Sequence, residues 1–204
     1  MSRTCQEVIA PYLKLVYELM MKNHIHSSRV INIDGTRTFI DRVAGVITDA
    51  DSPIPAFRQA LPRRHNMTIT LAIAMNGVLL PTQLICRKDT PLDEFKLLEQ
   101  HDVHVFQTDN WWHNASSYAN NLKQALSPVL QWRSIDHKKA IPILLLVDSH
   151  YSHLDVDVLE WCKSNNIIVV RPPSDTTHVI QALDCGDNAS LKNKLRTSLE
   201  QLFF

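Results

Sequence analysis

The chain has 204 residues, of which 45% are hydrophobic and 21% charged, and its 21 basic side chains balance 21 acidic ones. This composition argues against disordered and fibrous proteins, and the zero net charge argues against binding a polyanion through bulk charge alone. The longest apolar runs, such as 141–147, are far shorter than the ~20 residues of a membrane helix, and no secretory signal opens the chain. We therefore expect one globular domain that is neither secreted nor inserted in a membrane.

The first half of the chain predicts a helix, a strand and a hairpin. Apolar residues recur at helical spacing from Val8 to Met20, and a strand begins at 30–34. The segment 41–66 holds three prolines and no sustained period, so we expect a long irregular connection there. The dipeptide Asn76-Gly77 separates the apolar runs 68–75 and 78–86 and predicts an antiparallel hairpin.

The second half alternates helices and strands. A helix is predicted over 116–130, and the continuously apolar run 141–147 is expected to be the central strand of a sheet. A helix over 154–162 and a strand over 167–170 follow it and complete a right-handed parallel unit. Leucines spaced along 191–202 indicate a closing helix. The expected fold is therefore α/β, with a mixed sheet in which an antiparallel hairpin is followed by parallel strands, flanked by helices. This order matches the ribonuclease H-like fold.

Aspartates follow apolar runs at positions where a parallel sheet gathers ligands. Asp34 is expected at the end of the first strand and Asp148 at the end of the apolar run 141–147, and Asp184 follows 36 positions after Asp148. Each alone would be read as a strand-end or cap residue. Three carboxylates that meet would repel one another unless cations compensate, which favours Mg²⁺ or Mn²⁺. Asp187 could replace Asp184 as the third ligand, because residues three apart share a helix face.

Other polar clusters predict structure rather than chemistry. Asp155 and Asp157 fit the first turn of a helix, where they complement its dipole. Asp109 precedes a tryptophan pair that is expected to pack in the core. Histidines and cysteines in the last third follow no structural zinc spacing, so zinc is not favoured: His150, His153, Cys162, His178 and Cys185.

The last third of the chain carries a family resemblance. The stretch Asp148-Ser-His-Tyr-Ser-His153, the run Arg171-Pro-Pro173 and the segment Thr176-Thr-His-Val-Ile-Gln-Ala-Leu-Asp184 resemble DDE superfamily endonucleases, in particular the pogo, Tigger and jerky branch of the mariner-like transposases. Asn32-Ile-Asp34 is similar to the first-aspartate motif of that branch. The sequence departs from the pattern at Gly35, where the family often has Glu, and at Ala182, where it usually has Pro.

The resemblance implies a site, a reaction and partners. Asp34, Asp148 and Asp184 would be the catalytic residues and would hold two Mg²⁺ or Mn²⁺ ions, supported by His153 and Gln181. The reaction would be strand cleavage and transfer on DNA in the nucleus, with no small-molecule cofactor and no membrane partner, and a homodimer stays open. Residues 1–28 would be a leading helix left from a linker to a DNA-binding region, and 29–204 the catalytic domain, in an isolated or truncated chain.

Two other functions remain open. Asn32-Ile-Asp34-Gly-Thr36 also resembles the opening of haloacid dehalogenase-type phosphatases, but the covalent nucleophile there is an Asp, and Asn32 stands in its place. The second alternative is a catalytically silent, domesticated or truncated transposase core that serves as a nucleic-acid-binding or assembly module. The zero net charge is compatible with that alternative.

Overall fold

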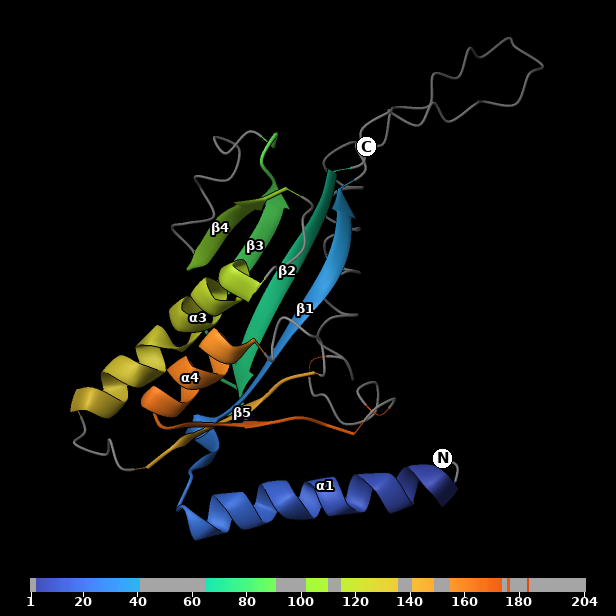
Figure 1. Cartoon of the computed structure of the whole chain (residues 1–204), viewed down its shortest axis with the longest axis vertical. Helices are drawn as coiled ribbons and strands as arrows, with labels where there is room; N and C mark the ends of the chain where they lie inside the picture. Colours follow the sequence, from blue (N-terminus) through green and yellow to red (C-terminus); the bar gives the residue numbers. More distant parts are fainter. Residues whose placement is uncertain are drawn as a thin grey trace.

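A mixed sheet of six strands organises the molecule. The computed structural model describes residues 3–40, 65–90, 102–109, 115–135, 141–148, 155–173, 176 and 183. Within these residues the strands lie in the order β4-β3-β2-β1-β5-β6 (Figure 1). The neighbours β1–β2 and β2–β3 are antiparallel, whereas β1–β5, β5–β6 and β3–β4 are parallel. The predicted mixed sheet, an antiparallel hairpin followed by parallel strands, is confirmed.

Strand β1, Val30–Ile40, is longer than the sequence indicated. It pairs with β2, His65–Ala74, from Ile31 opposite Ala74 to Ile40 opposite His65. The placement of Asp34 at the end of the first strand was therefore wrong, since it lies inside β1. Polar residues after Asp34 gave the impression of an end, but the antiparallel partner satisfies their backbone groups. Most of the predicted irregular connection, 41–64, lies outside the described residues.

The hairpin predicted at Asn76-Gly77 is present. Strand β3, Thr82–Arg87, runs antiparallel to β2, and a bridge between Ile73 and Leu79 continues the pairing toward the turn. Gly77 has a φ of +87°, and its N–H donates to the carbonyl of Ala74 at 2.8 Å. A residue with a side chain is strained at this φ, which explains the glycine.

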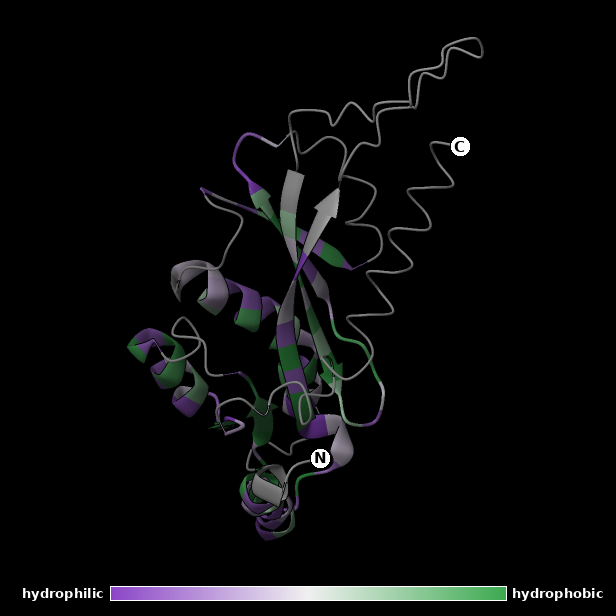
Figure 2. Cartoon of the chain, turned by 90° about the vertical axis from the view of Figure 1, so that its right-hand side faces the viewer, coloured by the Kyte–Doolittle hydropathy of each residue, from purple (hydrophilic) through white to green (hydrophobic). Residues whose placement is uncertain are grey.

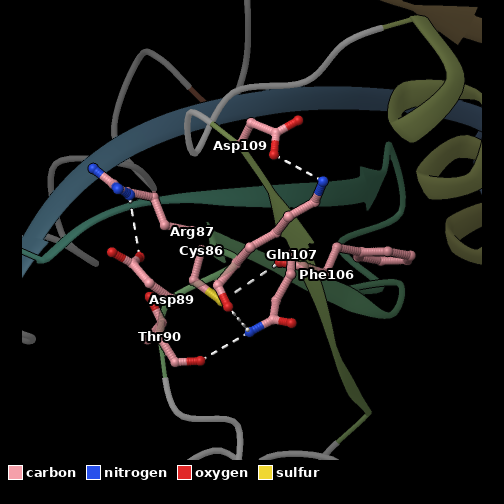
Figure 3. Close-up of polar contacts among 8 residues, drawn as sticks. Cys86, Arg87, Asp89, Thr90, Phe106, Gln107 and Asp109 are labelled. Carbon is pink, nitrogen blue, oxygen red and sulfur yellow. Dashed lines mark hydrogen bonds and ion pairs between the residues drawn. The ribbon is translucent and has the colours of Figure 1, made fainter.

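Strand β4, Val103–Thr108, was missed by the sequence reasoning. It lies parallel to β3 at the edge of the sheet. Gln107 fastens it there, because its Nε2 donates to the carbonyls of Lys88 at 3.3 Å and Thr90 at 2.8 Å (Figure 3). Asp109 follows β4 and is paired with Lys88 at 2.7 Å on the surface. Asp109 is thus placed at the edge strand, with β3 and β2 between it and β1.

The parallel unit predicted in the second half is confirmed. Strand β5, Ile143–Leu146, is followed by α4, Val156–Ser164, and by β6, Ile167–Val170, which pairs with β5. Asp155 caps α4, since its side chain accepts from the N–H of Asp157 at 3.0 Å. The expectation that the apolar run is the central strand was wrong, because β1 and β2 occupy the middle of the sheet. A strand that is covered on both faces is apolar along its whole length, whether or not it lies at the centre of the sheet. The apolar run therefore indicates that β5 is buried but not where it lies in the sheet.

Helices pack on both faces of the sheet, and each face has its own cluster of buried hydrophobic side chains. Helix α3, Ala115–Ile135, and α4 pack on the odd-numbered residues of β1 and β5, such as Ile31 and Leu145. Helix α1, Arg3–Lys22, is joined to β1 through a short 3-10 turn, Ser27–Arg29. Tyr12 of α1 packs with Val30, Leu144 and Val170, the alternate residues of the strands. Because alternate side chains of a strand point to opposite faces, α1 and the α3–α4 pair lie on opposite sides.

Helix α1 leaves much of its apolar surface uncovered. Figure 2 shows it nearly end-on below the N-terminus, with apolar and polar residues distributed around it. Five of its large apolar side chains are exposed: Val8, Leu13, Leu15, Tyr17 and Met21. No helix within the described ranges is long and apolar enough to cross a membrane. The closing helix predicted over 191–202 lies outside the described residues. The domain boundary predicted after residue 28 stays a prediction.

Candidate active site

Asp34 is the last residue of the continuously buried part of β1, which begins at Val30. Ile33, the residue before it, is buried in the α3–α4 cluster, whereas Gly35, the residue after it, is exposed. Asp34 itself is 8% exposed. Its partner across the hairpin is Leu71 of β2. A carboxylate buried this far needs polar or ionic partners to remain charged. The position is therefore suited to bind a cation or a proton donor rather than to improve solubility.

Asp148 approaches the same level of the sheet from β5. Asn32 of β1 is registered with Leu146 of β5, and each aspartate follows its member of this pair by two residues. The registered pairs of β1 and β5 end at Asn32 and Leu146, and beyond them the N–H of Val147 donates to the carbonyl of Val170 in β6 at 3.2 Å. Neighbouring strands lie about 4.8 Å apart, and residues two positions on keep the same face of the sheet. Continued by two residues, this register would place both carboxyl-bearing positions at the same level and on the same face of the sheet.

The charges of both aspartates affect the pKa of a buried tyrosine, Tyr118. Tyr118 of α3 is 2% exposed, and burial is the main reason why the pKa of its hydroxyl lies well above the ordinary value. The negative charge of Asp148, then the thiol of Cys162, and then the charge of Asp34 raise this pKa further. The hydroxyl therefore stays protonated at neutral pH and adds no charge beside the two aspartates.

One amide joins this region to the segment that precedes Asp184. Oδ1 of Asn32 accepts the N–H of Leu183 at 3.1 Å, and Nδ2 of Asn32 donates to the carbonyl of Leu146 at 3.1 Å. Leu183 is fully buried against β2 and β3 residues, such as Leu71 and Leu84. The remaining predicted site residues, which are His153, Gln181, Asp184 and the alternative Asp187, lie outside the described residues. The triad thus stays a prediction in which two members can be located.

The donor chemistry of Asp34 and Asp148 fits a hard divalent cation. Carboxylate oxygens are the ligands that Mg²⁺ and Mn²⁺ prefer, and two of them rise from adjacent strands. In the part of the chain that the structure describes, no three His, Cys, Asp or Glu side chains form a group that could hold a metal ion. A third carboxylate would have to come from outside that part, as the prediction for Asp184 requires.

The zinc alternative draws no support from Cys162. This residue of α4 is 1% exposed in the α3–α4 cluster, and burial raises the pKa of its thiol to about 11. Zinc takes the thiolate, which this environment disfavours. The other side chains considered for zinc, His150, His153, His178 and Cys185, lie outside the described residues.

Tyr118 and the two hydrogen bonds of Asn32 were not foreseen. Tyr118 falls within the helix predicted over 116–130, and Asn32 within the motif that resembles the first-aspartate motif of the family. No local pattern could have shown that the charges of two aspartates act on the phenol, or that the amide forms hydrogen bonds with backbone atoms 114 and 151 residues away. The one usable signal is a polar side chain, Asn32, between the apolar residues Ile31 and Ile33.

The chain matches a family model over most of its length. Residues 64–204 match DDE superfamily endonuclease, and the chain belongs to this family. The resemblance noted in the last third of the sequence is thereby confirmed at the level of the superfamily. The particular branch, pogo, Tigger and jerky, stays a prediction.

Solved structures with the same fold come from Mos1, a mariner transposase. The catalytic domain of Mos1 superposes with a TM-score of 0.57 at 12% identity, over 100% of this chain and 82% of that one. A pre-cleavage Mos1 transpososome gives a TM-score of 0.58 at 12% identity, and a Mos1 paired end complex with Mn gives 0.56 at 16% identity. This chain covers 56% of the Mos1 chain in both complexes. At such identities the likeness shows the fold, and the ribonuclease H-like prediction is confirmed.

A curated relative matches a short stretch only. It is MFS-type transporter clz9 from Cochliobolus lunatus, which is 37% identical over 59 residues, or 29% of this chain and 6% of that protein. The chain therefore spans a small part of this relative.

Proposed function

We propose that this chain catalyses transposase-type DNA strand cleavage and transfer, with Asp34, Asp148 and Asp184 holding two Mg²⁺ or Mn²⁺ ions. The observation that carries the proposal is the register of β1 and β5, in which Asp34 and Asp148 follow one paired position by the same two residues. Membership in the DDE superfamily endonucleases and the fold shared with Mos1 support it. A Mos1 complex contains Mn and another contains Mg, which supports the choice of ions.

The described residues have defined tasks in this proposal. Bound ions would lower the pKa of an attacking water and stabilise the leaving oxygen. Asp34, in one of the two middle strands of the sheet, would hold the ions together with Asp148 and Asp184. Tyr118 keeps its proton beside the carboxylates and excludes water from behind them, because it is almost fully buried.

The covalent changes balance without a redox partner. In cleavage, the oxygen of water bonds to a backbone phosphorus while the bond from that phosphorus to the 3′ oxygen breaks, and the 3′ oxygen takes up a proton. In transfer, the freed 3′ hydroxyl attacks a phosphorus of the target strand and displaces another 3′ oxygen. In this proposal the substrate is DNA and the reaction takes place in the nucleus. A second copy of the chain is an optional partner.

Plasmid nicking tests the proposal. Purified chain with Mn²⁺ is expected to convert supercoiled plasmid to the nicked form, and Asp148→Asn to reduce the rate by more than about 100-fold, which exceeds the usual loss for residues that only support metal ligands. Asp109→Asn serves as the control, since Asp109 is exposed at the edge strand and paired with Lys88. A wild-type chain that neither binds Mn²⁺ nor nicks plasmid would reject the activity and leave the silent transposase core.

The phosphatase alternative is less well supported. Asn32, which stands where such a phosphatase has its nucleophile, uses both ends of its amide for backbone hydrogen bonds. The family match is to endonucleases. Hydrolysis of a simple phosphate ester by the purified chain with Mg²⁺ would support the phosphatase and contradict the proposed function.

A further inference from the structure

Asn32 connects three distant parts of the chain through a single side chain. It lies in β1, is 6% exposed, and sits directly opposite Leu146 in the parallel register. Nδ2 donates to the carbonyl oxygen of Leu146 and Oδ1 accepts from the N–H of Leu183, each at 3.1 Å. Both partners are backbone atoms, so the amide fixes the course of the main chain in two other segments.

Each connected segment carries one of the predicted metal ligands. Asn32 precedes Asp34 by two residues, Leu146 precedes Asp148 by two, and Leu183 is the residue before Asp184. The distance from a fixed backbone atom to the following aspartate is thus at most two residues in every segment. The hydrogen bond to Leu183 reaches the third segment from 151 positions away, and the burial of Leu183 against Leu71 and Leu84 accompanies it.

The amide group is suited to this task because it offers a donor and an acceptor together. A carboxylate at position 32 would keep an acceptor for Leu183 but would face the carbonyl of Leu146 without a proton. An alanine would leave the N–H of Leu183 and part of the Leu146 carbonyl without this partner in a buried place, which is costly. Fold stability alone would explain a buried hydrogen bond, but not why both partners stand next to predicted ligands.

We infer that Asn32 is a positioning residue for the proposed metal site, because it ties the backbone of Leu146 and of Leu183, which precede Asp148 and Asp184, to the strand of Asp34. This inference rests on the proposed function, since it concerns the same ions. Groups that orient metal ligands from behind typically change metal affinity by about 10- to 100-fold when they are removed. Asn32→Ala should therefore raise the Kd for Mn²⁺ by about 10- to 100-fold, although Asn32 itself does not bind the ion.

Calorimetric titration with Mn²⁺ tests the inference on the full chain, with thermal unfolding measured in parallel. Gln83→Ala is the matched control, because Gln83 is a fully buried amide of β3 whose Nε2 donates to the carbonyl of Asn121 at 2.7 Å. Both substitutions should lower the melting temperature, but only Asn32→Ala should raise the Kd for Mn²⁺. The concentration of Mn²⁺ that half-saturates plasmid nicking should rise with the Kd.

A measurement on the wild type covers the case in which Asn32→Ala does not fold. Hydrogen exchange followed by NMR should find the Leu183 amide protected without metal, because its bond to Asn32 is already made. Exchange at the rate of an unfolded peptide would overturn the inference. An Asn32→Ala chain that folds and binds Mn²⁺ as tightly as the wild type would also overturn it while the proposed function stands. A wild type that binds no Mn²⁺ would instead reject the proposed function, and the metal-positioning role with it.

Discussion

Burial changes the chemistry of single side chains in this fold, and Cys162 shows the effect most clearly. Its side chain is 1% exposed between α4 and the sheet, and burial raises the pKa of the thiol to about 11. Cys86 of β3 is also fully buried, and burial is the main cause of its raised pKa. Both thiols are therefore uncharged at neutral pH and act as small apolar groups.

The raised pKa of Cys162 predicts a loss of stability in alkaline solution. The folded chain keeps the proton up to a pH of about 11, whereas the unfolded chain releases it near the ordinary value of 9.0. The stabilising contribution is therefore complete below pH 9 and decreases as the pH rises toward 11. Between pH 7.5 and 10.5, the free energy of unfolding of the wild type should fall by about 2 kcal/mol relative to Cys162→Ala, at 1.36 kcal/mol per pH unit.

Urea denaturation at a series of pH values measures this difference. Cys86 is present in both variants, so its own titration cancels in the comparison. Tyr118 does not cancel in full, because Cys162 is one of the groups that raise its pKa, and this coupling is part of the measured difference. A difference that stays constant up to pH 10.5 would contradict the assigned pKa.

At the scale of elements, α1 is an amphipathic helix whose two tyrosines have opposite surroundings. Tyr12 is 7% exposed and packs with Val30 and Leu144, whereas Tyr17 is 62% exposed. The helix also contains Pro11, so packing against the sheet rather than intrinsic helix propensity must hold it. The contact made by Tyr12 is accordingly the important one.

Substitution of the two tyrosines separates packing from exposure. Tyr12→Ala should cost roughly 3 to 5 kcal/mol of unfolding free energy, as for other large aromatic side chains removed from a core. Tyr17→Ala should change it by less than about 0.5 kcal/mol. Urea midpoints of the two variants give the measurement, and equal losses would show that α1 does not dock through Tyr12.

Elements with a strong local pattern could be predicted, and those defined by their partners could not. The periods of α1, α3 and α4 and the Asn76-Gly77 turn are local signals, and all four were correct. The length of β1 depends on pairing with β2, and β4 depends on Gln107 and on β3. Those interactions join residues far apart in sequence, so no window of the chain contains them.

The same division holds for the candidate site. Asp34 and Asp148 could be selected because each follows an apolar run, and the register of β1 and β5 is consistent with that choice. Tyr118 could not be selected, because its position in a helix resembles that of any core residue. The roles of all three aspartates stay predictions that the experiments above must decide.

At the scale of the whole molecule, the strand order brings together what the chain separates. Strand β1 lies between β2 and β5, and its partner residues in β5 are 114 positions away. Asp34 and Asp148 therefore come near each other only when the sheet has formed. A metal ion that binds both should bind the folded state alone, and metal binding should stabilise the whole fold.

Thermal unfolding with Mn²⁺ tests this coupling. A ligand at 100 times its Kd adds about 2.7 kcal/mol to the folded state, which for a domain of this size corresponds to a rise of roughly 5 to 11 °C in the melting temperature. Asp148→Asn should lose most of this rise, while Asp109→Asn should keep it, because Asp109 lies on the exposed edge beyond β3. Equal rises in all three proteins would mean that Mn²⁺ acts at scattered surface carboxylates. Since the unfolded chain holds Asp34 and Asp148 apart, a rise that depends on Asp148 would locate the ion where β1 and β5 meet.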